Sequence, residues 1–141
     1  MFDEMITKQE ELIKKFKTRD PFKLCEHLKI HIFFENLGNT YGYFNTFKQA
    51  KMIHINRNIL EHEQKFTCAH ELKHALFDSN INTPFLSENT LISVDKIEMQ
   101  ANYFATRLLI EDVKKFDTHQ KLLQYYGIPL EMERFIKHLR Y

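Results

Sequence analysis

Hydrophobic residues in the first part of the chain recur at near-helical intervals among charged ones, which predicts two helices. The first is expected over residues 4–17. The second is expected over 21–29, because Asp20 followed by Pro21 is typical of an N-cap and the first position of a helix.

The spacing then changes to short runs rich in branched and aromatic residues, which predict β-strands. These runs occupy residues 31–34, 41–47 and 51–56. Turns are expected at Gly38-Asn39 and Lys48-Gln49. Together these features predict a small antiparallel three-stranded sheet.

The second half of the chain returns to a helical pattern. Hydrophobic residues lie on two sides of the segment 61–78, which predicts a buried helix. The polar segment 79–93 is expected to be a loop that borders the functional site. Further helices are expected at residues 95–110, from Thr118 to about Gly127, and from Pro129 to about Arg140.

These elements predict one α+β domain over residues 1–141, with a sheet packed on helices. The core of the domain is expected at about 31–112, with N-terminal helices over 4–29 and C-terminal helices over 118–140. A chain of 141 residues can bury a hydrophobic core without a metal or a disulfide. A bound metal would therefore serve function rather than folding.

Composition and charge narrow the class of protein. The formal net charge of +1 gives no general attraction to nucleic acid or to anionic lipid. The sequence shows neither a signal peptide nor an apolar run long enough to span a membrane, so a cytoplasmic location is expected. Cys25 and Cys68 lack the spacing of a zinc ribbon or a redox pair and are expected to be small buried residues.

The candidate chemistry lies in the run His70-Glu71-Leu72-Lys73-His74, which has the H-E-x-x-H pattern of zinc hydrolases. Residues four apart on a helix share a face, so both histidines can direct a ring nitrogen at one metal ion. Glu71 would lie beside the metal, where it could take a proton from an attacking water. The competing interpretation is that these histidines are hydrogen-bonded core residues.

A catalytic zinc site needs a third protein ligand. Glu98 is the best candidate, because Ala101 and Ala105 on the same helix face would allow close packing against a neighbouring helix. Asp78 and Asp95 remain as alternatives.

Two separated motifs resemble the ImmA/IrrE metallopeptidases. The resemblance covers about residues 41–112 and joins the motifs in the order found in that family. The residues that carry it are Ile53-His54-Ile55-Asn56, Phe66-Thr67-Cys68-Ala69-His70-Glu71-Leu72-Lys73-His74 and Glu98-Met99-Gln100-Ala101-Asn102-Tyr103-Phe104-Ala105-Thr106-Arg107-Leu108-Leu109.

The resemblance implies a compact, zincin-like (gluzincin-type) metallopeptidase core. It also implies a protein partner, because many members are encoded on phages and mobile elements and cleave the helix-turn-helix repressor that keeps the element silent. The sequence departs from the family pattern in three places, one of which is that Leu108-Leu109-Ile110 lacks the Met-Pro that often follows the paired leucines. Lys73 stands where glycine is usual, so it would crowd the backbone above the helix or place a charge at the cleft rim, and Gln100 replaces a second acidic residue.

The residues and the resemblance together predict a zinc endopeptidase that carries one Zn²⁺ per chain on His70, His74 and Glu98, with Glu71 as the catalytic base. Asn102 is expected to orient a ligand histidine, and Tyr103, His54 or a tyrosine of the sheet to serve as oxyanion donor. The expected partner is a helix-turn-helix repressor, without direct contact to nucleic acid or membrane. Two alternatives remain: a metal-bearing module that binds the repressor without cutting it, and an inactive toxin-antitoxin component.

Overall fold

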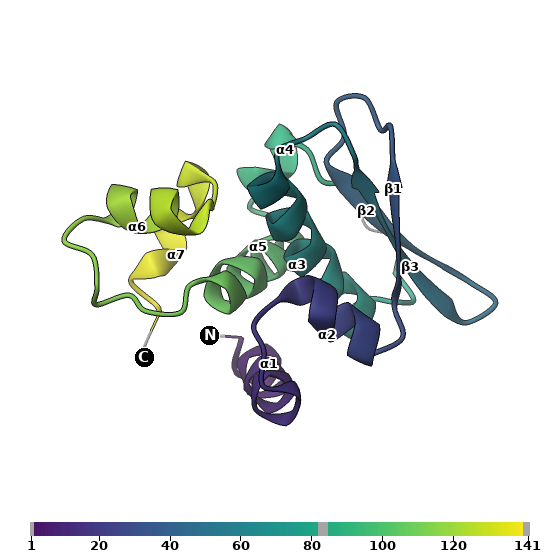
Figure 1. Cartoon of the computed structure of the whole chain (residues 1–141), viewed down its shortest axis with the longest axis horizontal. Coiled ribbons are helices and arrows are strands. Elements are labelled where there is room, and N and C mark those ends of the chain that lie inside the picture. The colour runs from purple at the N-terminus through teal and green to yellow at the C-terminus, as the bar shows by residue number, and fades with distance from the viewer. Residues whose placement is uncertain (1, 82–84, 140–141) are drawn as a thin grey trace.

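A three-stranded sheet packs against the central helix in the computed structural model of the chain, which describes residues 2–81 and 85–139 (Figure 1). The strands are β1 (His31–Glu35), β2 (Gly42–Phe47) and β3 (Ala50–Asn56). The helical segments are α1 (Asp3–Phe16), α2 (Pro21–His27), α3 (Glu61–Phe77), α4 (Glu88–Leu91), α5 (Lys96–Leu109), α6 (His119–Tyr126), the 3-10 turn η1 (Leu130–Met132) and α7 (Glu133–Ile136). The predicted α+β class is confirmed.

The sheet is mixed, not wholly antiparallel, and its strand order is β1-β3-β2. β2 and β3 form the expected antiparallel hairpin, with Lys48 and Gln49 at positive φ in its turn. The prediction is wrong for β1, which pairs with β3 in parallel. Parallel pairing arises because the segment after β1 crosses the end of β3 to reach β2 on the far side.

The side chain of Asn56 holds this crossing segment in place. Its Nδ2 donates hydrogen bonds to the carbonyl oxygens of Gly38 and Thr40, each at 2.9 Å. The turn expected at Gly38 is present, with φ +61°, but it leads past β3 rather than back along β1. A local turn signal therefore did not determine which strands pair.

The long helices lie within one or two residues of the ranges predicted for them. In the predicted loop at 79–93, the structure adds the short helix α4; residues 82–84 lie outside the described part of the chain. The last predicted helix is divided into η1 and α7, and Arg140 is also outside the described residues. Gly127 ends α6 in the left-handed conformation, as expected.

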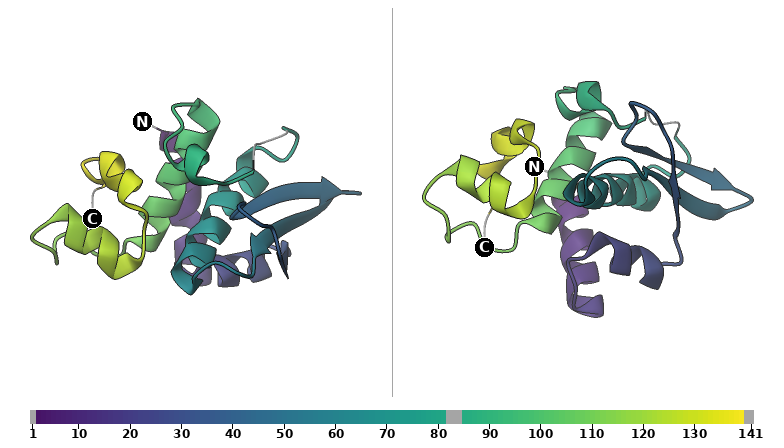
Figure 2. Two further views of the ribbon diagram at one scale, coloured as in Figure 1. Left: turned by 90° about the horizontal axis from the view of Figure 1, so that it is seen from above. Right: turned by 45° about the horizontal axis from the view of Figure 1, so that its top comes forward.

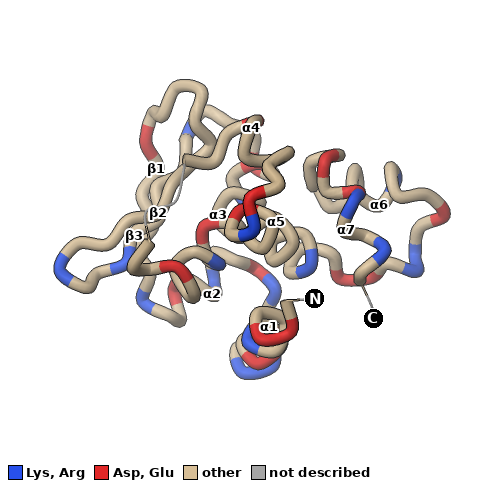
Figure 3. Tube along the Cα trace, turned by 180° about the vertical axis from the view of Figure 1, so that it is seen from behind, with Lys and Arg blue, Asp and Glu red and all other residues tan. Residues whose placement is uncertain are grey.

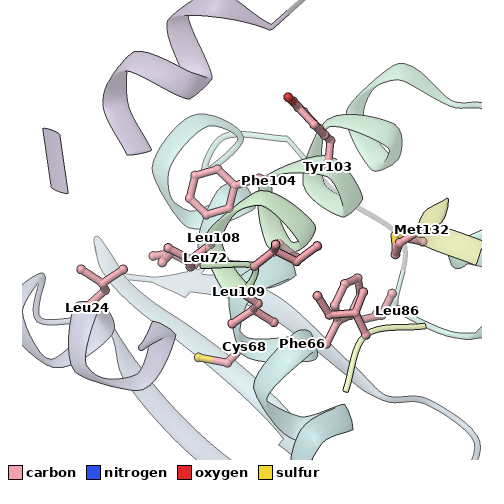
Figure 4. Close-up of a cluster of buried hydrophobic side chains, with 14 of the residues drawn as sticks. Leu24, Phe66, Cys68, Leu72, Leu86, Tyr103, Phe104, Leu108, Leu109 and Met132 are labelled. Atoms are coloured by element: carbon pink, nitrogen blue, oxygen red, sulfur yellow. The ribbon is translucent and has the colours of Figure 1, made fainter. Parts of the chain in front are cut away.

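α3 is the centre of the core, with the sheet on one side and α5 on the other. Ile53 and Ile55 of β3 are fully buried, as their alternation along the strand requires. Figure 4 shows Phe66, Cys68 and Leu72 of α3 in one cluster with residues of α5. Both views in Figure 2 place α6 and α7 beyond α5, at the end farthest from the sheet. α3 is thus buried along most of its circumference.

The two cysteines lie within this core. Cys25 of α2 and Cys68 of α3 are fully buried, and their sulfur atoms are 3.8 Å apart without a disulfide. Burial raises the pKa of the Cys68 thiol well above its ordinary value. Both cysteines are small buried residues, as the sequence predicted.

Candidate metal centre

α3 places two imidazoles and a carboxylate around one point inside the protein. The Nε2 atoms of His70 and His74 are 3.3 Å apart, and both side chains are fully buried. One ligand atom from each of His70, Glu71 and His74 lies within 4.8 Å of the others. Spacing of four residues brings the two rings to the same face of the helix. His70, Glu71 and His74 therefore form a cluster that could hold a metal ion.

α5 brings Glu98 to the same point. One carboxylate oxygen of Glu98 lies 3.0 Å from Nε2 of His70 and 3.3 Å from Nε2 of His74. The side chain of Asp95 caps the start of α5 by accepting a hydrogen bond from the backbone N–H of Ile97 at 3.0 Å. Glu98, in the first turn, then faces α3, and Ala101 and Ala105 are fully buried along the helix. Among the three candidates for a third ligand, Glu98 is the one that lies beside Nε2 of both histidines.

The outer nitrogens of the two histidines are also occupied. Nδ1 of His70 is 2.8 Å from Oδ1 of Asn102, whose amide group donates to the carbonyl of Thr90 at 3.0 Å. Nδ1 of His74 is 2.9 Å from Oδ2 of Asp78. Because both partners are acceptors, each Nδ1 carries a proton, and Nε2 is the nitrogen that remains to face a metal ion. This is the arrangement that a metal-binding histidine requires.

Burial and charge strongly perturb the acidic groups of the centre. Burial raises the pKa of Glu71 to about 8, against an opposing effect of His74. Burial would also raise the pKa of Glu98, but hydrogen bonds from the two histidines outweigh it and lower the pKa to about 2. The two carboxyl groups thus differ in environment: Glu98 is held as an anion, and Glu71 favours its protonated form.

The two histidines also have pKa values shifted in opposite directions. Burial lowers the pKa of His70. Burial acts in the same direction on His74, but hydrogen bonds to Asp78 and Glu98 outweigh it and raise the pKa of His74 to about 9. An imidazolium at His74 therefore balances Glu98 when protein groups alone are considered.

The donor atoms fit a zinc ion. Tetrahedral zinc with bonds of about 2.0–2.1 Å to nitrogen or oxygen separates neighbouring ligand atoms by roughly 3.3 Å. The distances between His70, His74 and Glu98 are 3.0–3.3 Å. Both carboxylate oxygens of Glu71 are buried without a hydrogen-bond partner among the described residues. Such an orphaned carboxyl group is costly unless it serves a ligand or a reaction.

Comparison with known proteins agrees with this chemistry. Residues 25–135 match the sequence profile of the peptidase M78 family, described as the IrrE N-terminal-like domain. The chain belongs to this family. The predicted ImmA/IrrE membership is confirmed, and membership in the M78 peptidases supports a metallopeptidase activity.

Two relatives are similar over most of this M78 chain. It is 43% identical over 104 residues to the uncharacterized immunity region protein 2 of Bacillus phage phi105, covering 73% of this chain and 66% of that protein. It is 35% identical over 133 residues to metallopeptidase ImmA of Bacillus subtilis (strain 168), covering 86% of this chain and 77% of that protein. No solved structure matches the chain.

Lys73 does not lie at a cleft rim in this member of the family. Its side chain is buried, with an exposed fraction of 1%, and its ammonium contacts Asp78 and Gln100. The expectation of a positive charge at the rim is therefore wrong. The contact between Asp78 and His74 was also missed, although their spacing of four residues on one helix face was a signal for it.

His54 and Tyr103, the two named oxyanion candidates, lie in other surroundings. His54 falls between the inward-facing Ile53 and Ile55, so it lies on the opposite face of the sheet. There it pairs with Glu35 and stacks on Tyr43 with ring centroids 4.3 Å apart. The expectation that His54 reaches the site is not met.

Tyr103 lies on α5 and contacts the C-terminal segment. Its hydroxyl donates to the carbonyl of His138 at 3.3 Å, and its ring packs against Phe135 with centroids 5.6 Å apart. These contacts direct it away from the cluster on α3. Asn102, in contrast, lies beside His70 as the sequence predicted.

One cavity lies away from the candidate metal centre. It has a volume of about 930 Å³, between the start of α3 and the segment of α6 and η1, and none of His70, Glu71, His74 or Glu98 lines it. A second cavity of about 530 Å³ runs beside β2 and the residues that follow α3. We place the chemistry at the buried cluster, because reactive groups converge there and not in the larger cavity.

Charge is not concentrated at one element of the chain. Acidic and basic positions are interspersed along the chain (Figure 3). Within residues 2–81 and 85–139, none of the helices combines the length and the hydrophobicity needed to cross a membrane.

Proposed function

We propose that this chain is a zinc-dependent endopeptidase that cleaves a helix-turn-helix repressor of a phage or mobile element. One observation carries the proposal: two imidazole nitrogens and the Glu98 carboxylate converge within 3.0–3.3 Å beside the unpartnered Glu71. One relative is named a metallopeptidase, and the other an immunity region protein of a phage. These names support a protein substrate connected with phage immunity.

His70, His74 and Glu98 would hold the zinc ion. When bound, zinc supplies Lewis-acid activation of a water molecule and of the scissile carbonyl. Asn102 and Asp78 keep the two imidazoles in the ligand tautomer through their outer nitrogens. The protein therefore provides three ligands that are oriented before the metal arrives.

Glu71 is proposed as the general base. Its carboxylate would take a proton from the attacking water and deliver it to the nitrogen of the leaving amine. Its position supports this role, because the carboxyl group is fully buried beside His70 and His74. The absence of hydrogen bonds to Glu71 among the described residues leaves both oxygens available.

The outer edge of β2 is the proposed docking position for an extended substrate segment. At its start, the carbonyl of Gly42 accepts a backbone hydrogen bond of 2.9 Å from the N–H of Leu86. From Tyr43 to Phe47, the described part of the chain pairs β2 only with β3, and the 530 Å³ cavity runs alongside. A peptide could add there as a further strand.

A non-cleaving metal-bearing module that inactivates the repressor by association is the second candidate. The observation that favours it is the burial of the centre, since His70, Glu71 and His74 are fully buried and Glu98 is 2% exposed. A peptide bond reaches Glu71 only if the groups covering the centre move.

Substitution of Glu71 distinguishes the two candidates. The experiment compares purified wild-type protein with Glu71→Gln and Glu61→Gln. Each is incubated with a helix-turn-helix repressor encoded next to this chain, and cleavage and zinc content are measured. Glu61 is the matched control, because it lies on the same helix but is exposed. We expect Glu71→Gln to retain zinc and lose cleavage, while Glu61→Gln keeps both. Cleavage undiminished by Glu71→Gln would contradict the peptidase mechanism, and a complex with intact repressor that tolerates a chelator would favour the second candidate.

A further inference from the structure

Lys73 is a buried cation inside the motif that carries the proposed ligands. Its Nζ lies 2.6 Å from Oδ2 of Asp78 and 3.1 Å from Oε1 of Gln100. Asp78 is itself only 6% exposed. Burying an ammonium group and a carboxylate is costly unless each is paired and hydrogen-bonded. Lys73 and Asp78 must therefore stay paired for either group to remain buried at low cost.

A single oxygen connects this ion pair to the metal centre. Oδ2 of Asp78 accepts from Nζ of Lys73 and is also 2.9 Å from Nδ1 of His74. Asp78 follows the last turn of α3, where its backbone N–H donates to the carbonyl of His74 at 2.8 Å. Lys73 and His74 thus share one carboxylate oxygen, at the point where the helix ends.

Two of the departures from the family pattern, Lys73 and Gln100, contact each other in the structure. Gln100 gives the ammonium of Lys73 a second acceptor without adding a second negative charge. An acidic residue at position 100 would compete with Asp78 for the same ammonium. With glutamine there, Asp78 is the charged partner of Lys73 among the described residues.

We propose that Lys73 is a positioning residue, which holds the Asp78 carboxylate on Nδ1 of His74 and so fixes the direction in which Nε2 meets the metal. The inference rests on the proposed zinc site, but it does not require cleavage of any substrate. Groups that hydrogen-bond a ligand histidine alter metal affinity by about 10–100-fold when they are removed. Lys73 acts one step further out, through Asp78.

The test is a double-substitution cycle read out as zinc affinity. Lys73→Met, Asp78→Asn and the double variant are titrated with zinc against a chromophoric chelator, after circular dichroism has shown that each is folded. We expect each single substitution to weaken zinc binding by about 10-fold. Because both act through one carboxylate, the double variant is expected to be weakened by about 10-fold as well, not by the product of about 100-fold.

Further variants separate positioning from helix packing. Lys73→Arg keeps the charge and is expected to restore zinc affinity to within about three-fold of wild type, since the guanidinium can still pair with Asp78. Gln100→Met is the matched control, because it removes the second acceptor of Lys73 but leaves Asp78 in place, and we expect a change below about two-fold. Lys73→Gly, the usual residue of the family, replaces Lys73→Met if methionine prevents folding, with the same expected loss.

Three results would overturn the inference. The first is a folded Lys73→Met or Lys73→Gly variant with unchanged zinc affinity. The second is a double variant whose loss equals the product of the single losses, which would indicate independent structural roles. The third is a wild-type chain that binds no zinc. Failure of the proposed function is distinguishable, because it appears as cleavage by Glu71→Gln in a protein whose zinc affinity still responds to Lys73.

Discussion

The two histidines of the centre are held by different chemistry. His70 lies against a neutral amide, since Asn102 bridges it to the carbonyl of Thr90 in α4. His74 lies against a charge, since Asp78 bridges it to the buried ammonium of Lys73. We call the first set (His70, Asn102, Thr90) the His70 half and the second set (His74, Asp78, Lys73) the His74 half.

The two histidines of the candidate metal centre are therefore oriented in two physical ways, one by a neutral amide and the other by a charged carboxylate. The His70 half depends on how α5 packs against α3 and α4, so it forms only with the tertiary structure. The three members of the His74 half lie within six consecutive positions around the end of α3. Substitutions that disturb helix packing should therefore displace His70. Substitutions that remove a charge should displace His74.

The largest effect is expected where the halves meet, at Glu98. Its carboxylate contacts Nε2 of both histidines, so Glu98→Ala removes the group they share. We expect zinc affinity to fall by more than about 100-fold, beyond the range that outer hydrogen-bond partners produce. Chelator competition measures this, and Asp95→Ala, which removes an exposed helix cap nearby, is the control. Retained affinity in Glu98→Ala would show that the ligand lies elsewhere.

Removal of zinc tests both halves together. Zinc at about 100 times its dissociation constant is expected to add roughly 2.7 kcal/mol to the free energy of unfolding. A strong chelator should remove this increment, measured by denaturant unfolding, yet leave a folded chain with its own hydrophobic core. Glu98→Ala should not respond to the chelator. A wild-type protein whose free energy of unfolding is also unchanged by the chelator would argue against a zinc centre.

Asn102→Leu breaks the His70 half alone. The change removes the acceptor of His70 Nδ1 and the donor to Thr90, so we expect zinc affinity to fall about 10-fold. Each buried group left without a partner should also cost about 1–3 kcal/mol of stability. Zinc titration and urea unfolding measure the two effects. Unchanged values of both would mean that packing, not this amide, orients His70.

Tyr103→Phe should leave both halves intact. The hydroxyl donates to His138 in the C-terminal segment, so its removal is expected to cost about 0.5–1.5 kcal/mol of stability. Zinc affinity and cleavage should stay within about two-fold of wild type. A large fall in the turnover rate with unchanged stability would instead return Tyr103 to the reaction as an oxyanion donor.

The helices and the residues that converge at the candidate centre were accessible from the sequence because their signals are local. The periodicity of hydrophobic residues indicated α3 and α5, and the alanines beside Glu98 indicated close packing. The face of His54 was also accessible, since its neighbours Ile53 and Ile55 are strongly apolar and side chains alternate along a strand. Closeness to the motif in the sequence is a weaker guide to the position of His54 than this alternation.

The remaining features depend on contacts between distant residues. The parallel pairing of β1 with β3 is stabilised by hydrogen bonds from Asn56 to the crossing segment, and turn signals at Gly38 do not reveal this. The burial of Lys73 likewise depends on Gln100 from another helix. A lysine within a helix gives no local indication that it is buried.

X-ray absorption at the zinc edge of the purified protein tests the central claim most directly. The account predicts one zinc per chain, with two imidazole nitrogens and a carboxylate oxygen at about 2.0–2.2 Å. A protein without zinc, or a zinc ion with sulfur at about 2.3 Å, would contradict it.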